Sequence, residues 1–289
     1  MMKATYYPGC SLEGVARDYA DSIKCVCALM DVELQEIPDW NCCGATAAHS
    51  INRRASIELP RRNLRLARTL GNPDMLVPCP LCFNRLKTAV HDLELRNPCS
   101  EPPQGLEFPK IWDLAAFFAT DEKLEKIASR VQKRLEGLSV VSYYGCMASR
   151  PPYITGAPDY ENPLSLDKIV KTLGATPIDW PYKTDCCGAS LIVSMPGAGL
   201  KMVEKLLDMA RRFGAEAVVV SCQMCQGNLD MYQDRIEADT GKHYGLPIIY
   251  FTELIGLAWR LAEAGGWLSR HFIDPVPLLL RKGLMAGRG

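Results

Sequence analysis

The sequence predicts an α/β fold with two homologous tandem domains, each a largely parallel sheet flanked by helices, related by pseudo-twofold symmetry. Two observations predict it. One pattern of cysteines occurs twice in the same order, once in each half of the 289-residue chain. Within each half, short β-rich runs alternate with longer runs of helical periodicity, which is typical of parallel strands joined by crossover helices.

In the first half, the β-rich runs that we predict as strands are Ala4–Tyr7, Glu33–Ile37, Met75–Val77 and Lys110–Trp112. The stretches with helical periodicity are Leu12–Met30, Thr46–Leu70, Phe83–Leu95 and Asp113–Phe118. Because strands and helices alternate along the chain, the carboxyl ends of the strands are expected at one edge of the sheet.

The second half repeats this order, with strands predicted at Val140–Tyr144, Thr176–Asp179, Ala217–Ser221 and Pro247–Phe251. We expect two domains, residues 1–137 and 138–289, joined after the charged helical stretch Asp121–Gly137. The second domain ends in a tail, Trp267–Leu284, with a strongly apolar segment. That tail is expected to pack on the body of the protein or on a partner subunit.

Ten of the thirteen cysteines form two sets of five. Each set has a single cysteine, an adjacent pair followed by glycine, and a Cys-x-x-Cys motif. The first set is Cys10, Cys42, Cys43, Cys79 and Cys82; the second is Cys146, Cys186, Cys187, Cys222 and Cys225. The single cysteines, the pairs and the first cysteine of each Cys-x-x-Cys lie at or near the carboxyl end of a predicted strand. Each set is therefore expected at the sheet edge where open α/β folds bind ligands.

Neighbouring residues suit such a site. Gly44 and Gly188 allow the close backbone approach that a bending cysteine pair needs. Helices are expected to begin after Cys79 and after each pair, and helix N-termini favour anionic sulfides.

Several chemistries fit clustered cysteines. A lone cysteine is usually a small packed apolar residue, but ten in a duplicated pattern favour metal binding. Zinc is the main alternative, because Cys-x-x-Cys pairs are common zinc ligands, and zinc in one half stays open. Five cysteines exceed the four ligands of a structural zinc, and two adjacent cysteines hold one tetrahedral ion poorly. Two iron–sulfur sites are therefore favoured.

The composition excludes other classes of protein. Lys+Arg and Asp+Glu balance at 33 each, so no basic field attracts nucleic acid or anionic membrane. No apolar run approaches the roughly 20 residues needed to insert directly into a bilayer, and the N-terminus lacks a secretory signal. Thirteen cysteines without such a signal indicate a reducing compartment and a cytoplasmic protein, which disfavours disulfides.

The remaining candidates are weaker. Cys25 and Cys27 lie in a predicted helix without counterparts in the second half, and we interpret them as packing residues; Cys99 is expected in a loop. His49 and His91 also lack counterparts, which favours surface or helix-packing roles. Arg53, Arg54, Arg61 and Arg62 could attract an anionic substrate, although a solvated helix face is the simpler interpretation.

Motifs for other redox cofactors are absent. No Gly-x-Gly-x-x-Gly follows a predicted strand, and no phosphate-binding loop occurs. The cysteine run that is typical of ferredoxin cubane clusters is also missing. Electrons are therefore expected to arrive from another polypeptide.

The two cysteine sets are the signature of the CCG (cysteine-rich) domain, and the whole chain resembles the B subunit of heterodisulfide reductase. The resemblance covers both halves and is carried by Tyr-Tyr-Pro-Gly-Cys ending at Cys10, Asn-Cys-Cys-Gly-Ala from Asn41, and Cys-Pro-Leu-Cys-Phe-Asn-Arg-Leu from Cys79. The length is similar to that of a free-standing B subunit and not to that of the fused D subunit, which carries extra ferredoxin-type clusters.

The resemblance implies that each set of five cysteines holds a noncubane 4Fe–4S cluster and that no catalytic residue is needed beyond these ligands. It implies that the substrate is the disulfide of coenzyme M and coenzyme B, or a related disulfide, cleaved between the clusters with one electron from each. Electrons are then expected from a ferredoxin-type iron–sulfur subunit (HdrC-like) and ultimately from a flavoprotein subunit (HdrA-like).

Three other functions stay open. The iron–sulfur subunits of lactate- or glycolate-oxidising complexes also carry two such motifs, but typically continue Cys-Cys-Gly-Phe-Gly-Gly, whereas both pairs here continue with Gly-Ala. An electron-transfer subunit of another bifurcating complex is open in the same way, and a non-catalytic electron relay is the alternative from a different class.

Overall fold

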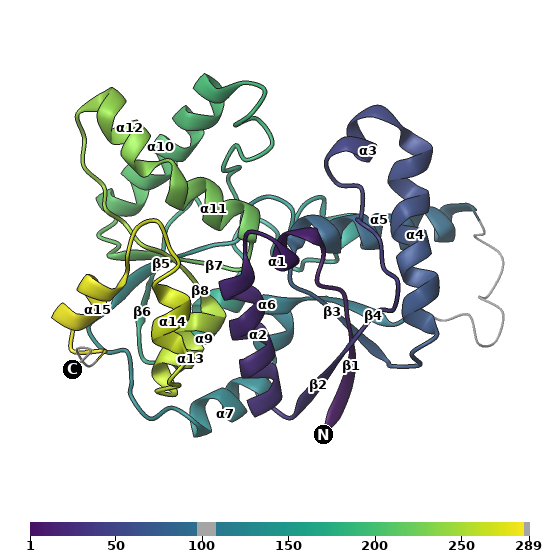
Figure 1. Ribbon diagram of the computed structural model, residues 1–289, viewed down its shortest axis with the longest axis horizontal. Helices are drawn as coiled ribbons and strands as arrows, with labels where there is room; N and C mark the ends of the chain where they lie inside the picture. The colour runs from purple at the N-terminus through teal and green to yellow at the C-terminus, as the bar shows by residue number, and fades with distance from the viewer. Residues whose placement is uncertain (97–107, 286–289) are drawn as a thin grey trace.

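The computed structural model describes residues 1–96 and 108–285. Within these residues the chain forms two four-stranded parallel sheets with equivalent strand orders, β2-β1-β3-β4 and β6-β5-β7-β8 (Figure 1). The strands of the first sheet are β1 (Met2–Tyr6), β2 (Val32–Glu36), β3 (Asp74–Val77) and β4 (Lys110–Asp113). Those of the second are β5 (Ser139–Tyr143), β6 (Thr176–Ile178), β7 (Ala217–Val220) and β8 (Ile248–Tyr250). The predicted fold class and all the predicted strands are confirmed.

The register of the strands explains why the sheet edge forms a site. Tyr6, the last residue of β1, pairs with Glu36 at the end of β2 and with Leu76 near the end of β3. In the second sheet, Tyr143 at the end of β5 pairs with Val220 at the end of β7. The connections that follow these strands therefore start side by side, and these connections carry the cysteines.

Helices connect the strands of the first sheet. They are α1 (Cys10–Glu13), α2 (Arg17–Leu29), α3 (Ala47–Ile51), α4 (Arg53–Arg68), α5 (Pro80–Arg96), α6 (Leu114–Phe118) and α7 (Asp121–Ser129). The helices of the second half are α8 (Pro152–Thr155), α9 (Ser165–Thr172), α10 (Pro196–Arg212), α11 (Gln223–Met231), α12 (Gln233–Thr240), α13 (Phe251–Ala258), α14 (Ala264–Leu268) and α15 (Val276–Arg281).

Three helix predictions were wrong in extent. The segment predicted as one helix over Leu12–Met30 breaks between α1 and α2, where Gly14 leaves helical geometry at φ −108° and ψ −99°; glycine is a poor helix former. The segment predicted over Thr46–Leu70 breaks at Asn52. That residue is extended and accepts a hydrogen bond from the Ala55 N–H (3.0 Å) as the N-cap of α4.

The third is the charged stretch Asp121–Gly137, which is helical only to Ser129. Beyond it, the backbone N–H groups of Gln132 and Lys133 both donate to the carbonyl of Ala258, at 3.0 and 2.9 Å. Contacts with the second half therefore replace the helical hydrogen bonds of this segment. The domain boundary predicted after residue 137 stays a prediction.

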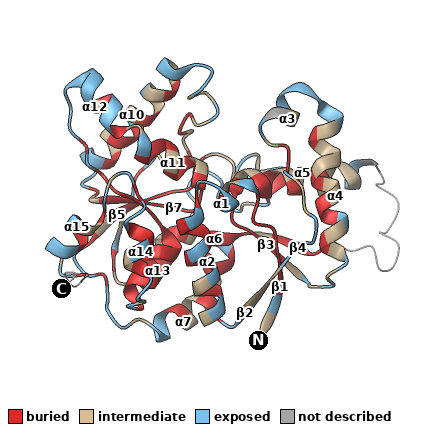
Figure 2. Ribbon diagram, viewed as in Figure 1, coloured by how far each residue is buried: buried red, intermediate tan, exposed pale blue. Residues whose placement is uncertain are grey.

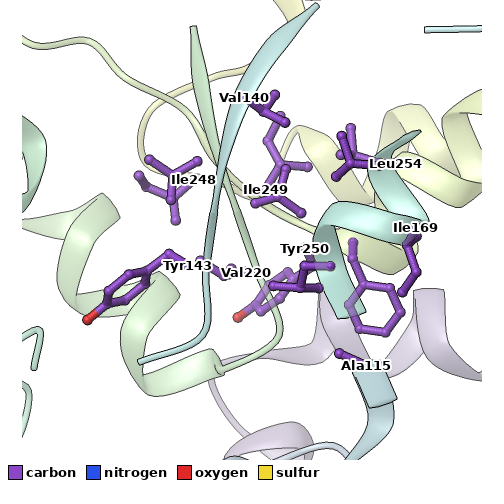
Figure 3. Close-up of a cluster of buried hydrophobic side chains, with 14 of the residues drawn as sticks. Ala115, Val140, Tyr143, Ile169, Val220, Ile248, Ile249, Tyr250 and Leu254 are labelled. Atoms are coloured by element: carbon purple, nitrogen blue, oxygen red, sulfur yellow. The ribbon is translucent and has the colours of Figure 1, made fainter. Parts of the chain in front are cut away.

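A shared hydrophobic core spans the two halves, and a smaller second cluster lies within the first half. Helix α2 of the first half packs against α13 and α14 of the second (Figure 1). The Tyr19 ring stacks on Tyr250 at 4.1 Å with an interplanar angle of 5°, and the Ser22 and Thr252 hydroxyls lie 2.7 Å apart. Figure 3 shows Ala115, from α6, in the same cluster as second-half residues. Strands β3, β5, β7 and β8 are almost entirely buried, whereas the edge strands β2 and β6 are mostly half-buried or exposed and α3 is largely exposed (Figure 2).

The C-terminal tail packs on this core. Packing on the body of the protein is one of the two arrangements that the sequence predicts for it. Leu279 is fully buried and Leu284 nearly so, both within the shared core. Among the described residues, no helix combines the length and the apolar character needed to cross a membrane.

Candidate metal centres

Each half brings its five cysteines together at the carboxyl edge of its sheet. In the first half the Cys43 and Cys82 Sγ atoms are 3.2 Å apart, and Cys42 and Cys79 contact their neighbours. Cys10 lies close enough to Cys42 to affect the charge of its thiol. The separation of 3.2 Å is well beyond the roughly 2.05 Å of a disulfide bond. The structure therefore gathers the first predicted set as five free thiols.

The second half repeats the arrangement. The Cys187 and Cys225 Sγ atoms are 3.6 Å apart, Cys146 contacts Cys186, and Cys222 contacts Cys225. The second predicted set is gathered in the same way, also as free thiols.

Glycines before the single cysteines make room for sulfur. Gly9 and Gly145 have φ of +72° and +68°, in the left-handed region that favours glycine. A Cβ at Gly9 would lie 3.0 Å from the Cys82 Sγ, and one at Gly145 would lie 2.8 Å from the Cys225 Sγ. The backbone therefore passes directly against the last cysteine of each set.

The glycines after the pairs act differently. Gly44 and Gly188 also have positive φ, +75° and +78°, and their N–H groups contact the Cys42 and Cys186 sulfurs at 3.4 Å. A Cβ at Gly44 would meet the Leu59 side chain at 2.9 Å. The close backbone approach expected from the sequence is present. At Gly44 the backbone approaches the neighbouring helix that carries Leu59.

Two tyrosines, whose repetition was visible in the sequence but whose role was missed, orient the cysteine pairs. The Tyr7 hydroxyl donates to the carbonyl of Asn41 (2.7 Å), and the Tyr143 hydroxyl donates to the carbonyl of Asp185 (2.6 Å). Asn41 and Asp185 each directly precede a cysteine pair. Burial, reinforced by the nearby thiols, raises the pKa of both tyrosines, so both remain hydrogen-bond donors. The signal in the sequence was a tyrosine three residues before each single cysteine.

The electrostatics of the first site favour a bound positive charge. Hydrogen bonds from Cys42 and Cys82 lower the pKa of Cys43 to about 3, while the pKa values of Cys42 and Cys82 are raised by the same contacts. A thiolate at Cys43 therefore disfavours ionisation of the two thiols that contact it, Cys42 and Cys82. These three can be thiolates together only if a cationic centre compensates their charge, as bound metal does. The donor set fits an iron–sulfur cluster.

Helix N-termini contribute at both Cys-x-x-Cys motifs. Helix α5 begins directly after Cys79, and α11 begins directly after Cys222. The Cys82 and Cys225 N–H groups point at the Cys79 and Cys222 sulfurs, at 3.5 and 3.4 Å. The expectation that a helix follows each cysteine pair is wrong for the second half, where turns cover residues 189–195 and α10 starts only at Pro196.

The two sites are neighbours across the junction of the halves. Tyr19, from α2, donates its hydroxyl to the carbonyl of Ser221 (3.0 Å), the residue before Cys222, and it also lies within electrostatic range of Cys79. The Gln223 side chain, which follows Cys222 in the second set, lies close enough to the Cys79 thiol of the first set to lower its pKa. These contacts bring the carboxyl edges of the two sheets close together.

The surroundings of the two sites differ. Cys10 and Cys42 are exposed, whereas their counterparts Cys146 and Cys186 are half-buried. Arg85, whose guanidinium has a pKa lowered by burial, lies within electrostatic range of Cys43. The second site instead has Asp185 beside Cys186, paired with Lys205 at 2.8 Å.

The weaker candidates lie outside the sites. Cys27 is fully buried in the core and Cys25 is half-buried, so the packing role is confirmed for Cys27; Cys99 falls outside the described residues. His49 is exposed, and His91 packs near the Tyr153 ring and the Glu94 carboxylate.

Three arginines of α4, namely Arg61, Arg62 and Arg65, form ion pairs with acidic residues. Arg61 is largely buried and pairs with Glu58 (2.8 Å) and Asp92 (2.7 Å), and Arg62 pairs with Asp39. The interpretation that these arginines lie on a solvated helix face is therefore wrong for Arg61. Arg53 and Arg54 are exposed.

Comparisons with known proteins agree with this arrangement. A profile of the cysteine-rich domain family (CCG) matches residues 4–87 and 140–230. The 8-methylmenaquinol:fumarate reductase membrane anchor subunit of Wolinella succinogenes is 28% identical over 94% of this chain and 98% of its own length. The B subunit of the ferredoxin/F(420)H(2)-dependent CoB-CoM heterodisulfide reductase of Methanosarcina acetivorans is 26% identical over 97% of both chains.

A solved structure shares the fold. The crystal structure of a hypothetical protein from Helicobacter pylori matches 94% of this chain with a TM-score of 0.70 at 11% identity. The chain spans about half of that protein's length, 52%.

Proposed function

The chain belongs to the cysteine-rich (CCG) domain family and carries its domain twice, and from this premise we propose that it is the catalytic iron–sulfur subunit of a heterodisulfide reductase-type complex. It reductively cleaves an organic disulfide, either CoM-S-S-CoB or a related one. The observation that carries the proposal is the pair of five-thiol sites joined across the halves by Gln223 and Cys79. A disulfide takes up two electrons and two protons to give two thiols, and two adjacent one-electron centres suit that stoichiometry.

The ten cysteines would hold two 4Fe–4S clusters of the noncubane type, one per set, which supply the electrons singly. Around them, this chain's own residues exclude water and fix geometry. Cys79, Cys82, Cys222 and Cys225 are buried, so the inner side of each site is dry. Tyr7 and Tyr143 hold the backbone before each pair. Zinc in one half remains the alternative for that half's five thiols.

Partners follow from the absence of any motif for another redox cofactor in the sequence. We propose that a ferredoxin-type iron–sulfur subunit delivers electrons and that a flavoprotein subunit supplies them, in a reducing, cytoplasmic compartment. Relatives named as subunits of multisubunit reductases support the existence of such partners.

A second candidate is a non-catalytic electron relay in a quinol-oxidising complex. The observation that favours it is the relationship to the fumarate reductase subunit of Wolinella succinogenes, at 28% identity over 94% of the chain. In that case the clusters would pass electrons to a partner that carries out the reduction.

Metal content is the first test. Iron, acid-labile sulfide and zinc are measured per chain in anaerobically purified protein. About eight irons with matching sulfide support two four-iron sites. About four irons with one zinc would rule out cleavage between two clusters.

The second test separates catalysis from relay. The purified chain, reduced with a viologen dye, is mixed with heterodisulfide, and thiol release is measured. The catalytic proposal expects two thiols per disulfide from this chain alone, and loss of thiol release in Cys187→Ser with electron uptake at the first site intact. Electron uptake without thiol release in the wild type would favour the relay.

A further inference from the structure

A groove outside the cysteine sites opens between the halves. It has a volume of about 610 Å³ and is lined by the edge strand β4, by α5 and α6, and by the segment between β5 and α9. We call it the interdomain groove and define it by Phe83, Lys87, Trp112, Asp113, Ser149 and Lys168. Its volume lies within the roughly 300–1,000 Å³ that is typical of sites for small organic molecules.

The groove is apolar along its walls and positively charged at its rim. Trp112 and Phe83 line it from the first half, and Lys87, Lys110 and Lys168 surround it against only two carboxylates, Asp113 and Asp159. Lys110 lies over the Trp112 ring at 3.6 Å. Within residues 1–96 and 108–285, neither Lys87 nor Lys168 forms an ion pair with a carboxylate. Both ammonium groups are thus available to an anionic ligand.

The walls of the groove are held at a fixed separation. The Asn84 side chain donates to the carbonyls of Met147 (3.2 Å) and Arg150 (2.8 Å), which ties the start of α5 to the segment that carries Ser149. The groove is therefore preformed, which lowers the entropic cost of binding.

From these observations we propose that the interdomain groove binds an organic anion with an apolar body. Lys87 and Lys168 bind the anionic group, and Trp112 and Phe83 contact the apolar body. Binding in the interdomain groove does not depend on bound clusters. The proposal can therefore fail while the proposed function holds, and the reverse is also true.

The test uses the full chain as purified, with 10-hydroxydecanoate as the probe and decane-1,10-diol as its neutral counterpart. Binding is measured by calorimetry at low salt. We expect saturable binding of one hydroxydecanoate per chain, and binding of the diol at least tenfold weaker. Raising the ionic strength should weaken only the anion, because salt screens its contacts with the lysines.

Variants locate the site. Lys87→Gln combined with Lys168→Gln should weaken hydroxydecanoate about tenfold, since each exposed charge contact contributes up to about fivefold. Ala116→Phe, at an exposed position on the groove wall, should abolish binding by filling it. The matched control is Lys133→Gln, an exposed lysine outside the groove, and melting temperatures verify that all variants fold. Equal binding of acid and diol, unchanged affinity in the double variant, or no binding to the wild type would each overturn the proposal.

Discussion

The two cysteine sites have the same backbone arrangement but different surroundings. Both have a glycine against the last sulfur, a tyrosine that fixes the residue before the pair, and a helix that begins at Cys-x-x-Cys. The first site is more open and has Arg85 nearby, whereas the second is more enclosed and has Asp185 beside it. Duplication therefore preserved the geometry for ligation, while the charge and access around each site changed. Two centres of one kind would then differ in reduction potential and in exposure to substrate.

The largest effect should come from removing one ligand at a time. Cys43→Ser is expected to remove the first site's metal and about half of the iron, because Cys43 contacts both Cys42 and Cys82. Cys187→Ser should do the same at the second site. Iron and sulfide analysis with electron paramagnetic resonance checks this. If either variant lost the metal and the paramagnetic signals of both sites, the two sites would not be independent of each other.

The glycines before the single cysteines give the next effect. Gly145→Ala should destabilise the chain by roughly 3 kcal/mol, because a positive φ and a Cβ close to a sulfur both cost energy. In the structure that Cβ lies 2.8 Å from the Cys225 Sγ, against 3.0 Å at the equivalent Gly9. Gly156→Ala is the matched control, since its φ is +72° but nothing lies within 4 Å. Chemical denaturation should give about 1 kcal/mol for that control; an equal loss in both variants would leave the sulfur contact without a role.

A third difference is the tail, which only the second half carries. His271 lies in a buried network with Glu253 (3.0 Å) and Asp18 (3.7 Å), and Gln226 joins it to Asp230. Burial lowers the pKa of His271, but Glu253, with Asp230 and Asp18, overcomes this and raises it to about 9.

Because that pKa is raised, the stabilisation is complete below about pH 6.5 and is lost as the pH rises through about 9. We expect a loss of roughly 3 kcal/mol across this window. Burial also raises the pKa of Asp18, to about 6, which adds a further loss as the pH rises from about 4 to about 6. Denaturation as a function of pH should show the slope in the wild type and in Arg270→Gln, an exposed control, but not in His271→Gln. A slope that survives in His271→Gln would assign it to other groups.

The tyrosines allow a matched comparison of the two sites. Tyr7→Phe and Tyr143→Phe each remove one hydrogen bond to the residue before a cysteine pair. Each should cost about 1 kcal/mol in unfolding free energy. Losses that agree within a few tenths of a kcal/mol would support equivalent roles. No loss at one position would mean that the backbone there is held in another way.

The smallest effect should lie in reduction potential. Arg85→Gln is expected to lower the potential of the first site by roughly 30 mV, because the lost positive charge stabilised the reduced state. Lys205→Gln should shift the second site less, since Lys205 is exposed and its charge is screened. Redox titration followed by electron paramagnetic resonance measures both. A larger shift in reduction potential at the second site would contradict the expectation that Arg85 affects its site more strongly than Lys205 affects the other.

Much of the fold and the sites could be predicted because their signals are local. Val-rich runs such as that of β7 predict buried parallel strands, and cysteines at their ends predict the clusters. Helix breaks were harder to predict. Asn52 interrupts a continuous amphipathic pattern by capping α4, a choice that depends on how α3 packs.

Contacts across the halves could not be predicted. The Tyr19 hydroxyl bonds a carbonyl 202 residues away, and Gln223 reaches Cys79, neither of which has any periodic signal in the sequence. The interdomain groove likewise depends on the relative placement of the halves, which only tertiary packing determines.

The insertion of α2 against α13 and α14 has a consequence for biosynthesis. The ribosome completes Tyr19 and Ser22 long before Tyr250 and Thr252, their partners in the core. Until those partners emerge, the apolar face of α2 remains exposed to solvent or to chaperones, and the first cysteine set lacks its neighbour Gln223. Metal loading of the complete first site is therefore expected after translation ends, and a truncated N-terminal half should be aggregation-prone on its own.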